Sequence, residues 1–338
     1  EKVNILKYYI LIFTSIIIIS CQNEVNNKTN GQINNINPDL EKLDQLIAKY
    51  PNDPKKYIER ANILILAGNE SGAINDLSKS IELDSSLTEA YYLRAKQYYK
   101  LKQYPEALQD LKRCYQKNKK NTSLIKMIAQ IYLYAGKHKE AIKFSNELLK
   151  IDIHNADAYF IKGYAFKEMK DTSKSISTFQ TALEQNPEMY NAQMQLGLIY
   201  SDMKNPIAIQ YFNNAKNIRP DVLNPNYNIA MFYQNTGQYE DAKKAYRKLI
   251  ELNNQYEKAY YNLGYVYLFQ DSLDLAIQMF TLAIKTLPYY QDAYYNRGLC
   301  HEKNNNIMMA LKDYKQSINL DPDHILANKA IKRLNNIQ

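Results

Sequence analysis

Small residues recur through this chain at a nearly constant spacing of 34 residues, and this period constrains the fold more than any other feature. The first series is Ala61, Ala95, Ala129, Gly163, Gly197, Ala230, Gly264 and Gly298. The second series is Ala73, Ala107, Ala141, Ser175, Ala208, Ala242, Ala276 and Ala310. Each series has a single step of 33, because one residue is missing between Gly197 and Ala208, where Pro206 marks a turn. Self-similarity at this length indicates a repeat array.

The composition favours helices within each repeat. The chain has 338 residues but only 9 Gly and 10 Pro, too few for a protein built from strands and tight turns. With Ala61 at position 8, positions 4, 7, 8 and 11 of each repeat form the i, i+3, i+4, i+7 stripe of an amphipathic helix. A single helix pair is too small to bury its own apolar face, so neighbouring pairs must stack into a solenoid.

The repeat resembles the tetratricopeptide repeat, which has small residues at positions 8 and 20, aromatic residues at 11 and 24, and often proline at 32. The aromatic residues here are Tyr98, Tyr132, Phe166, Tyr200, Tyr233, Tyr267, Phe179, Phe212, Tyr246, Phe280 and Tyr314. The prolines at position 32 are Pro187, Pro220, Pro288 and Pro322. The third repeat departs most, with Ile125 at position 4 and Ser145 at position 24. The resemblance implies an all-α fold, a right-handed α-solenoid of eight helix-turn-helix repeats over residues 54–322, with a leading helix at 38–53 and a C-terminal capping helix at 323–338.

The N-terminal segment predicts a targeting signal and a membrane anchor. Lys2 and Lys7 precede a largely apolar run of 12 residues at 8–19, which is shorter than the roughly 20 residues of a membrane-spanning helix. The run ends in the sequence IISC, which resembles the lipobox of bacterial lipoproteins. That resemblance implies a signal peptide at 1–20, a lipidated Cys21, and lipid anchoring to a membrane of the bacterial cell envelope, with the outer membrane expected, on its periplasmic face or at the cell surface. The alternative is a short amphiphilic anchor with an incidental cysteine. The Asn-rich residues 22–37 predict a flexible tether after Cys21.

No catalytic or metal-binding motif is visible in the sequence. The four histidines, His138, His154, His301 and His324, show no metal-ligand spacing, and there is no phosphate loop or nucleophile elbow. Cys114 and Cys300 lie several repeats apart, which argues against a disulfide between them in a solenoid and favours buried packing positions. We therefore expect a protein that is not an enzyme, with no cofactor and no metal, and we expect no nucleic acid among its partners.

A second stripe on the first helix of each repeat predicts a binding groove. Positions 5, 6 and 9 face away from the packing stripe and should line the inner, concave surface. In repeats four to eight, positions 5 and 9 hold Phe160, Tyr164, Met194, Leu198, Tyr227, Met231, Tyr261, Tyr265, Tyr295 and Leu299. Position 6 of the last three repeats holds Asn228, Asn262 and Asn296, amides that could bond the backbone of an extended or helical partner segment. The alternative is that the tyrosines and asparagines are buried between adjacent first helices and stabilise the stack.

Charge is concentrated in one part of the chain. Residues 100–150 hold 12 Lys and Arg against 4 Asp and Glu, whereas the remainder is neutral. The basic patch predicted in and beside this region is Lys96, Lys112, Arg113, Lys117, Lys119, Lys120 and Lys126. Such a patch indicates an acidic partner or an anionic membrane surface, although a solvated lysine-rich face is the alternative.

Two functions follow as expectations. The first is a membrane-anchored, non-catalytic scaffold that binds a segment of another protein in its concave groove and serves as an adaptor in the cell envelope. The second is an envelope structural or regulatory protein that binds anionic lipid, polysaccharide or an acidic protein through residues 100–150.

Overall fold

The computed structural model describes the backbone of residues 29–335 and the side chains of residues 38–335. The predicted signal peptide, Cys21 and the first residues of the predicted tether lie outside this range. The described residues form eighteen α-helices and no strand. None of these helices combines the length and the apolar character that crossing a bilayer requires.

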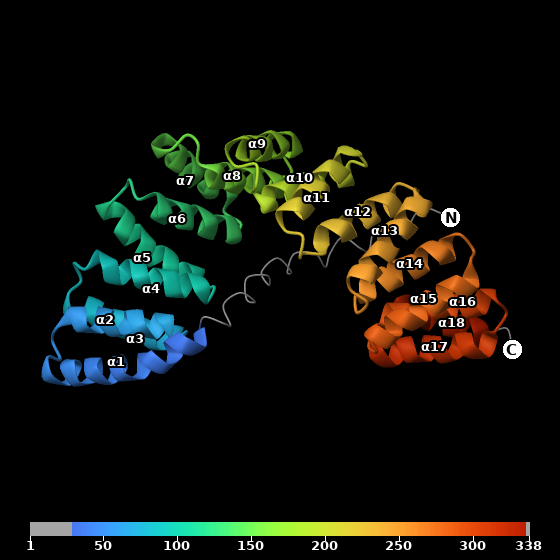
Figure 1. Ribbon diagram of the computed structural model, residues 1–338, viewed down its shortest axis with the longest axis horizontal. Helices are drawn as coiled ribbons and strands as arrows, with labels where there is room; N and C mark the ends of the chain where they lie inside the picture. Colours follow the sequence, from blue (N-terminus) through green and yellow to red (C-terminus); the bar gives the residue numbers. More distant parts are fainter. Residues whose placement is uncertain (1–28, 336–338) are drawn as a thin grey trace. The chain divides into compact units, whose positions relative to one another are not determined.

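The helices follow one another in antiparallel pairs (Figure 1). The helices of the first part are α1 (Thr29–Lys49), α2 (Pro54–Leu66), α3 (Glu70–Leu83), α4 (Thr88–Lys100), α5 (Tyr104–Lys117), α6 (Thr122–Tyr134) and α7 (His138–Ile151). Those of the second part are α8 (Ala156–Glu168), α9 (Thr172–Gln185), α10 (Tyr190–Asp202), α11 (Ile207–Ile218), α12 (Asn224–Asn235), α13 (Tyr239–Leu252), α14 (Glu257–Phe269), α15 (Leu273–Thr286), α16 (Gln291–Lys303), α17 (Ile307–Leu320) and α18 (Ile325–Asn335).

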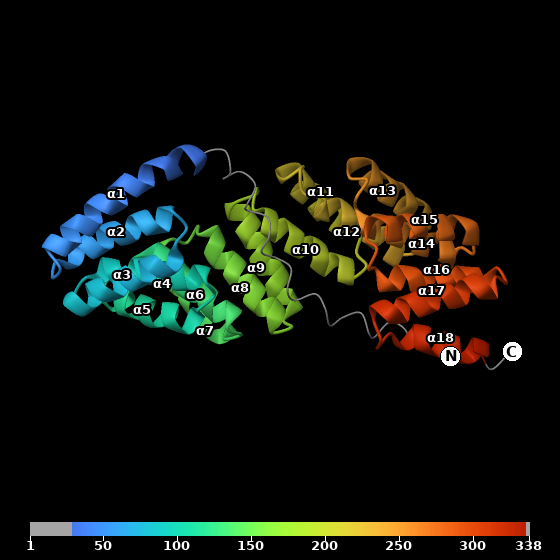
Figure 2. The ribbon, with the colours of Figure 1, turned by 90° about the horizontal axis from the view of Figure 1, so that it is seen from below.

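The pairs from α2–α3 to α16–α17 are the eight predicted helix-turn-helix repeats, and within each pair the two helices pack along their length (Figure 2). The chain divides into two compact units between Ile151 and Asp152. The first unit ends with α7, and the second begins with α8. Within each unit the second helix of one repeat packs against the first helix of the next, so the stacking predicted from the period is confirmed.

Every repeat turns between its two helices through the same left-handed residue at position 15. Glycine occupies this position as Gly68, Gly136 and Gly237, with φ angles of 72°, 69° and 77°. Lys102, Lys170, Lys204, Asp271 and Asn305 adopt the same left-handed conformation in the other repeats. A left-handed residue directly after a helix satisfies the last backbone carbonyls, which ends the first helix at the same place in each repeat.

The core of each repeat depends on a size match between positions 8 and 24. In the first two repeats alanine meets leucine, as Ala61 meets Leu77, and both side chains are fully buried. Four later repeats pair glycine with an aromatic ring. A Cβ added to Gly163 would lie 2.7 Å from the ring of Phe179, and the same contact for Gly197 and Phe212 would be 2.5 Å. Glycine gives the rings of these four repeats their room, whereas the sixth repeat places Ala230 with the ring of Tyr246 in one buried cluster.

The leading helix is longer than the sequence predicted. Helix α1 begins at Thr29, so part of the segment predicted as a flexible tether is helical, and Pro38 lies inside the helix instead of at its start. The helix ends at Lys49 because Pro51 disfavours helical backbone at the residue before it.

Helix α18 occupies the place of the predicted capping helix. His324 precedes it, and the Nδ1 atom of its ring accepts a hydrogen bond from the backbone N–H of Ala327 at 3.2 Å. Ala327, Ala330 and Leu334 are buried against Ala310 and Tyr314 of the last repeat. The helix therefore covers an apolar face that would otherwise be open to water.

Candidate functional site

The first helices of the second unit place the predicted groove residues in register. Positions 5, 6 and 9 fall on α8, α10, α12, α14 and α16, one set for each repeat. Because every repeat uses the same turn and the same packing, equivalent residues form rows that run from one first helix to the next. We call the surface formed by positions 5, 6 and 9 of these helices the first-helix face.

The tyrosines at position 5 are partly covered by aromatic rings that precede the next first helix. Tyr261 stacks on Tyr290, with ring centroids 4.7 Å apart and planes at 29°. Tyr227 meets Tyr256 edge-on at 5.8 Å, and Tyr295 lies 5.1 Å from the ring of His324. The covering residues also recur every 34 positions, a signal that the sequence contained and that our prediction of the groove overlooked.

The amides at position 6 contribute to this stack. Asn262 is 9% exposed, and its Nδ2 atom donates to the Tyr227 hydroxyl at 3.1 Å and to the Lys258 backbone oxygen at 2.9 Å. Asn296 is also buried, and its Nδ2 atom donates to the Tyr261 hydroxyl at 2.8 Å. The structure thus favours the stacking alternative at these two positions, because their amides already join adjacent repeats.

Asn228 differs from the other two asparagines. The residue at position 5 of the preceding repeat is Met194, which is buried and has no hydroxyl to accept a hydrogen bond. The Asn228 side chain is half-buried. Of the three predicted amides, Asn228 is therefore the one whose neighbour in the preceding repeat gives it no tyrosine partner.

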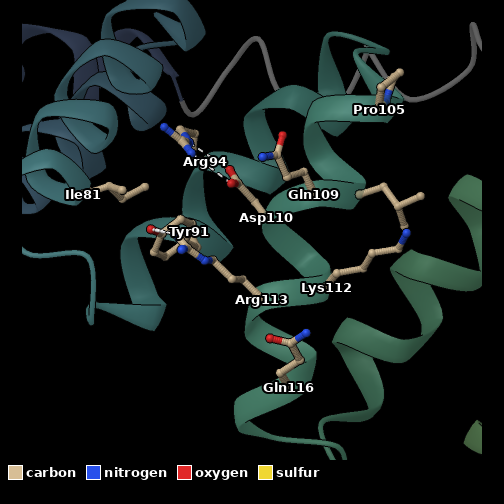
Figure 3. A pocket seen from close by; sticks show the side chains of 10 residues that line it. Ile81, Tyr91, Arg94, Pro105, Gln109, Asp110, Lys112, Arg113 and Gln116 are labelled. Carbon is tan, nitrogen blue, oxygen red and sulfur yellow. Dashed lines mark hydrogen bonds and ion pairs between the residues drawn. The ribbon is translucent and has the colours of Figure 1, made fainter.

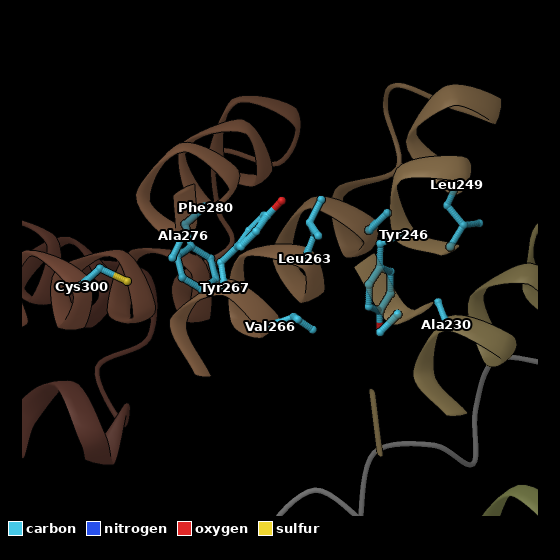
Figure 4. Close-up of a cluster of buried hydrophobic side chains, with 11 residues drawn as sticks. Ala230, Tyr246, Leu249, Leu263, Val266, Tyr267, Ala276, Phe280 and Cys300 are labelled. Carbon is cyan, nitrogen blue, oxygen red and sulfur yellow. The ribbon is translucent and has the colours of Figure 1, made fainter. Parts of the chain in front are cut away.

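Behind this face lies a buried apolar cluster (Figure 4). Tyr246 of the sixth repeat is a fully buried member of this cluster, and it donates from its hydroxyl to Gln234 Oε1 at 2.8 Å. Burial raises the pKa of Tyr246 and of Tyr227, so both hydroxyls stay protonated and can donate hydrogen bonds. The rings of the cluster hold α12 and α14 in a defined register.

Position 9 is the outermost row of the first-helix face. Tyr164, Leu198, Met231 and Leu299 are half-buried, whereas Tyr265 on α14 is 41% exposed. One turn further along α14, Phe269 is 63% exposed, with its ring 5.0 Å from that of Tyr239. Phe160 at position 5 is half-buried against Phe179. The most accessible aromatic surface among these residues is therefore on α14.

The predicted basic patch lies in the first unit and is mostly exposed. Its exposed members are Lys96, Lys112, Arg113, Lys117, Lys119 and Lys120. Lys126 on α6 is half-buried. Only Lys112 and Arg113 line a common cavity, beside α3 and α4 (Figure 3). The structure thus separates this pair from the other lysines of the patch.

The titratable groups of the described residues form no recognisable catalytic arrangement. No group of three or more His, Cys, Asp or Glu side chains between residues 38 and 335 is placed to hold a metal ion. Cys114 and Cys300 are free and buried, and burial raises their thiol pKa values to about 11 and about 12. Thiols with such pKa values are protonated at neutral pH and are poor nucleophiles.

Comparison with known proteins identifies the repeats. Family models of the tetratricopeptide repeat match residues 127–152, 156–189, 223–256, 257–286 and 292–324. Tetratricopeptide repeat protein 13 of Homo sapiens is 30% identical over 128 residues, covering 38% of this chain and 15% of that protein. The Hsp70-Hsp90 organizing protein of Triticum aestivum is 24% identical over 241 residues, covering 69% of this chain and 41% of that protein. The chain thus spans less than half the length of either relative.

A solved structure with the same fold is the C-terminal part of a tetratricopeptide-repeat-containing protein from Cytophaga hutchinsonii. It is 19% identical to this chain, has a TM-score of 0.59, and covers 70% of this chain and 98% of its own. At this identity the likeness concerns the fold alone. The repeat period and the helix pairs agree with these matches, and we conclude that the matched parts of residues 127–324 are tetratricopeptide repeats.

Proposed function

We propose that this chain is a non-catalytic scaffold that binds a segment of another protein along the first-helix face of its second unit. The observation that supports the proposal best is the exposed aromatic surface of α14, where Tyr265 and Phe269 are 41% and 63% exposed. Stacked repeats commonly offer an extended surface of this kind to protein partners. Exposed aromatic groups beside half-buried apolar ones supply the contact area that such binding needs.

The proposed contact surface is narrower than the set predicted from the sequence. It keeps the apolar row at position 9 together with Asn228, and it omits Asn262 and Asn296, whose amides bond to tyrosines of the preceding repeat. Met231 on α12 and Leu299 on α16 flank Tyr265 in this row. A partner segment would cross successive first helices and meet one apolar side chain from each repeat.

We further propose that Cys21 carries a lipid that holds the chain to a membrane of the bacterial cell envelope. This part rests on the sequence of residues 1–21 alone. The test is metabolic labelling with a fatty acid, together with membrane fractionation, for the parent chain and for Cys21→Ser. Labelling that persists in the variant, or a variant that fractionates like its parent, would refute lipid anchoring at this residue.

The groove is tested by site-specific photocrosslinking in the full chain. A photoreactive phenylalanine analogue is placed at position 265 in one protein and at Met308 in a matched control. Met308 is 79% exposed but lies on α17, a second helix. We expect a discrete crosslinked protein from position 265 and none from position 308. Equal crosslinking at both positions would contradict a specific first-helix face.

A further inference from the structure

The first unit contains a cavity of about 600 Å³ lined by α3, α4 and α5 (Figure 3). Ile81 comes from α3, Tyr91 and Arg94 come from α4, and the remaining lining residues come from α5. All of them belong to one unit, so the cavity does not depend on the first-helix face of the other. Its volume would accommodate several side chains of a bound segment.

The charges around the cavity do not cancel. The Arg94 guanidinium forms two hydrogen bonds with the Asp110 carboxylate, at 2.8 and 2.9 Å, and Asp110 is 3% exposed. The opposite charges of Arg94 and Asp110 therefore cancel each other. Lys112 and Arg113 remain, and among the described lining residues Asp110 is the only carboxylate. The cavity therefore carries two positive charges that no lining acid balances.

Arg113 is already held at the cavity wall. Its guanidinium carbon lies 4.9 Å from the centroid of the Tyr91 ring, and Nη1 donates to the Tyr91 hydroxyl. The guanidinium group has five N–H donors, so this contact leaves others available. A cation held in place in this way loses less conformational entropy when an anion binds it.

The sixth repeat, which contains α13, has an acidic residue that the cavity lacks. Arg247 and Lys248 on α13 occupy the positions that Lys112 and Arg113 occupy on α5. Arg247 donates to the Tyr267 hydroxyl at 2.5 Å, and Lys248 pairs with Glu251 at 3.0 Å. The equivalent of Glu251 on α5 is uncharged.

That equivalent residue is Gln116, which also lines the cavity. Gln109, Lys112, Arg113 and Gln116 share one face of α5, since they are spaced i, i+3, i+4 and i+7. The two amides can each donate and accept hydrogen bonds, as a peptide backbone requires. Ile81 and Pro105 add apolar surface beside them.

We propose that this cavity binds an acidic peptide segment of a protein partner, with an Asp or Glu carboxylate of the partner pairing with Arg113. Lys112, whose Nζ lies 5.9 Å from the centroid of the Tyr132 ring, adds positive charge on the other side of α5 (Figure 3). The partner's carboxylate takes the place that Glu251 occupies beside Lys248. The apolar surface and the two glutamine amides favour a peptide over a phosphate or a lipid headgroup, which would use the positive charge alone. This site is separate from the one proposed on the first-helix face.

The test measures binding of fluorescein-labelled hexaglutamate to the full chain by fluorescence anisotropy at about 50 mM salt, a concentration at which surface charge is only partly screened. Hexaglutamine with the same label is the neutral control. We expect hexaglutamate to bind at least about tenfold more tightly, as charge-assisted pairing predicts. Equal binding of the two peptides would overturn the proposal.

The sharpest variant is Gln116→Glu, which builds into α5 the carboxylate that α13 already has. We expect it to weaken hexaglutamate binding by at least roughly fivefold, because the new carboxylate competes for the same cations. The matched control is Ser123→Glu, which makes the same change of charge on the exposed surface of α6, outside the cavity. Its effect should stay within about twofold. Equal weakening by both variants would mean that only the general positive field binds the peptide.

Two further measurements remain decisive even if Gln116→Glu fails to fold. Hydrogen exchange on the unmodified chain should show protection of residues 105–116 when hexaglutamate is added, and its absence would contradict the site. Vesicles of phosphatidylcholine with 30 mol% phosphatidylglycerol form the lipid arm. If these vesicles bind the chain while hexaglutamate does not, the site recognises lipid headgroups and the proposal of a peptide site is wrong.

Discussion

The side-chain amide of Asn262 donates a hydrogen bond to the hydroxyl of Tyr227, which lies one repeat earlier, at 3.1 Å. Asn296 makes the same bond with Tyr261 at 2.8 Å. These two bonds tie α14 to α12 and α16 to α14 across the boundaries between repeats. Because a solenoid is stabilised by the interfaces between neighbouring repeats, the bonds belong to its stability.

Removing one of these amides should destabilise the second unit. Asn262→Ala leaves the partly covered Tyr227 hydroxyl without this donor, and we expect the free energy of unfolding to fall by about 1–2 kcal/mol. The measurement is urea unfolding followed by circular dichroism. Asn228→Ala is the matched control, since Met194 offers it no hydroxyl, and its cost should stay near 0.5 kcal/mol or below. Equal costs for the two variants would refute the stacking role.

Replacing the glycine at position 8 should test the size match with position 24. In Gly197→Ala the new Cβ would lie 2.5 Å from the Phe212 ring, so the ring must move. We expect a loss of about 1–3 kcal/mol, the usual cost of an overpacked core, despite the better helix propensity of alanine. The melting temperature reports the change.

A second substitution should rescue that variant. Gly197→Ala with Phe212→Leu recreates the Ala61 and Leu77 pair of the first repeat, in which both side chains are fully buried. We expect the double variant to be more stable than Gly197→Ala alone, since leucine leaves room for the added methyl group. A double variant that simply adds the two losses would show that the pairing is not a local size match.

His301 should make the stability of the last repeat depend on pH. Its desolvation holds its pKa below the usual value for histidine, although the Asp313 carboxylate at 3.9 Å opposes the shift. The folded state therefore resists protonation that the unfolded chain accepts below pH about 6.5. The contribution of His301 to the free energy of unfolding is therefore fully present above that pH, and it is lost as the pH falls below it.

The variant that tests this is His301→Gln. We expect its free energy of unfolding to change less between pH 7.5 and pH 5.5 than that of the parent protein, since one source of unequal proton uptake is gone. The measurement is urea unfolding at several pH values in that interval. If the parent and the variant have the same slope, His301 does not contribute to the pH dependence.

The buried thiols should not react in the folded state. Burial raises the pKa of Cys114 to about 11 and that of Cys300 to about 12, so at pH 8 both remain protonated and shielded. We expect a thiol-specific reagent to modify these two residues slowly in the native protein and rapidly in urea. Peptide mapping by mass spectrometry distinguishes them from Cys21. Rapid native labelling of Cys300 would contradict its placement in the core.

The candidate site was only partly predictable from the sequence. The period placed Tyr227, Tyr261 and Asn262 on the correct face of their helices, because equal spacing along a solenoid means equal position in each repeat. The sequence left open whether that face meets a ligand or a neighbouring repeat. The answer depended on Tyr256 and Tyr290, which cover the position-5 rings from just before the next helix.

The cavity in the first unit could not be found from the sequence. The lysines of residues 100–150 predicted a basic surface, but the sequence does not distinguish a lysine that lines a cavity from one on the open surface. Only the folded chain shows that Asp110 is paired with Arg94 and that the guanidinium of Arg113 lies against the ring of Tyr91. These contacts come from residues 16 and 22 positions apart on two helices, and they depend on how those helices cross.

The architecture of this protein could be predicted from its repeat period. A 34-residue period with small residues at two fixed positions allows only stacked helix pairs, since each pair must bury its apolar stripe against the next. Which polar groups form hydrogen bonds or ion pairs within the stack depends on how the helices pack. Asn262, Asn296 and Asp110 bond to partners on other helices, whereas Lys112 and Arg113 lack the acid that Lys248 has. Hydrogen bonds and ion pairs between helices depend on distances of a few tenths of an ångström, and a period of residue types does not contain those distances.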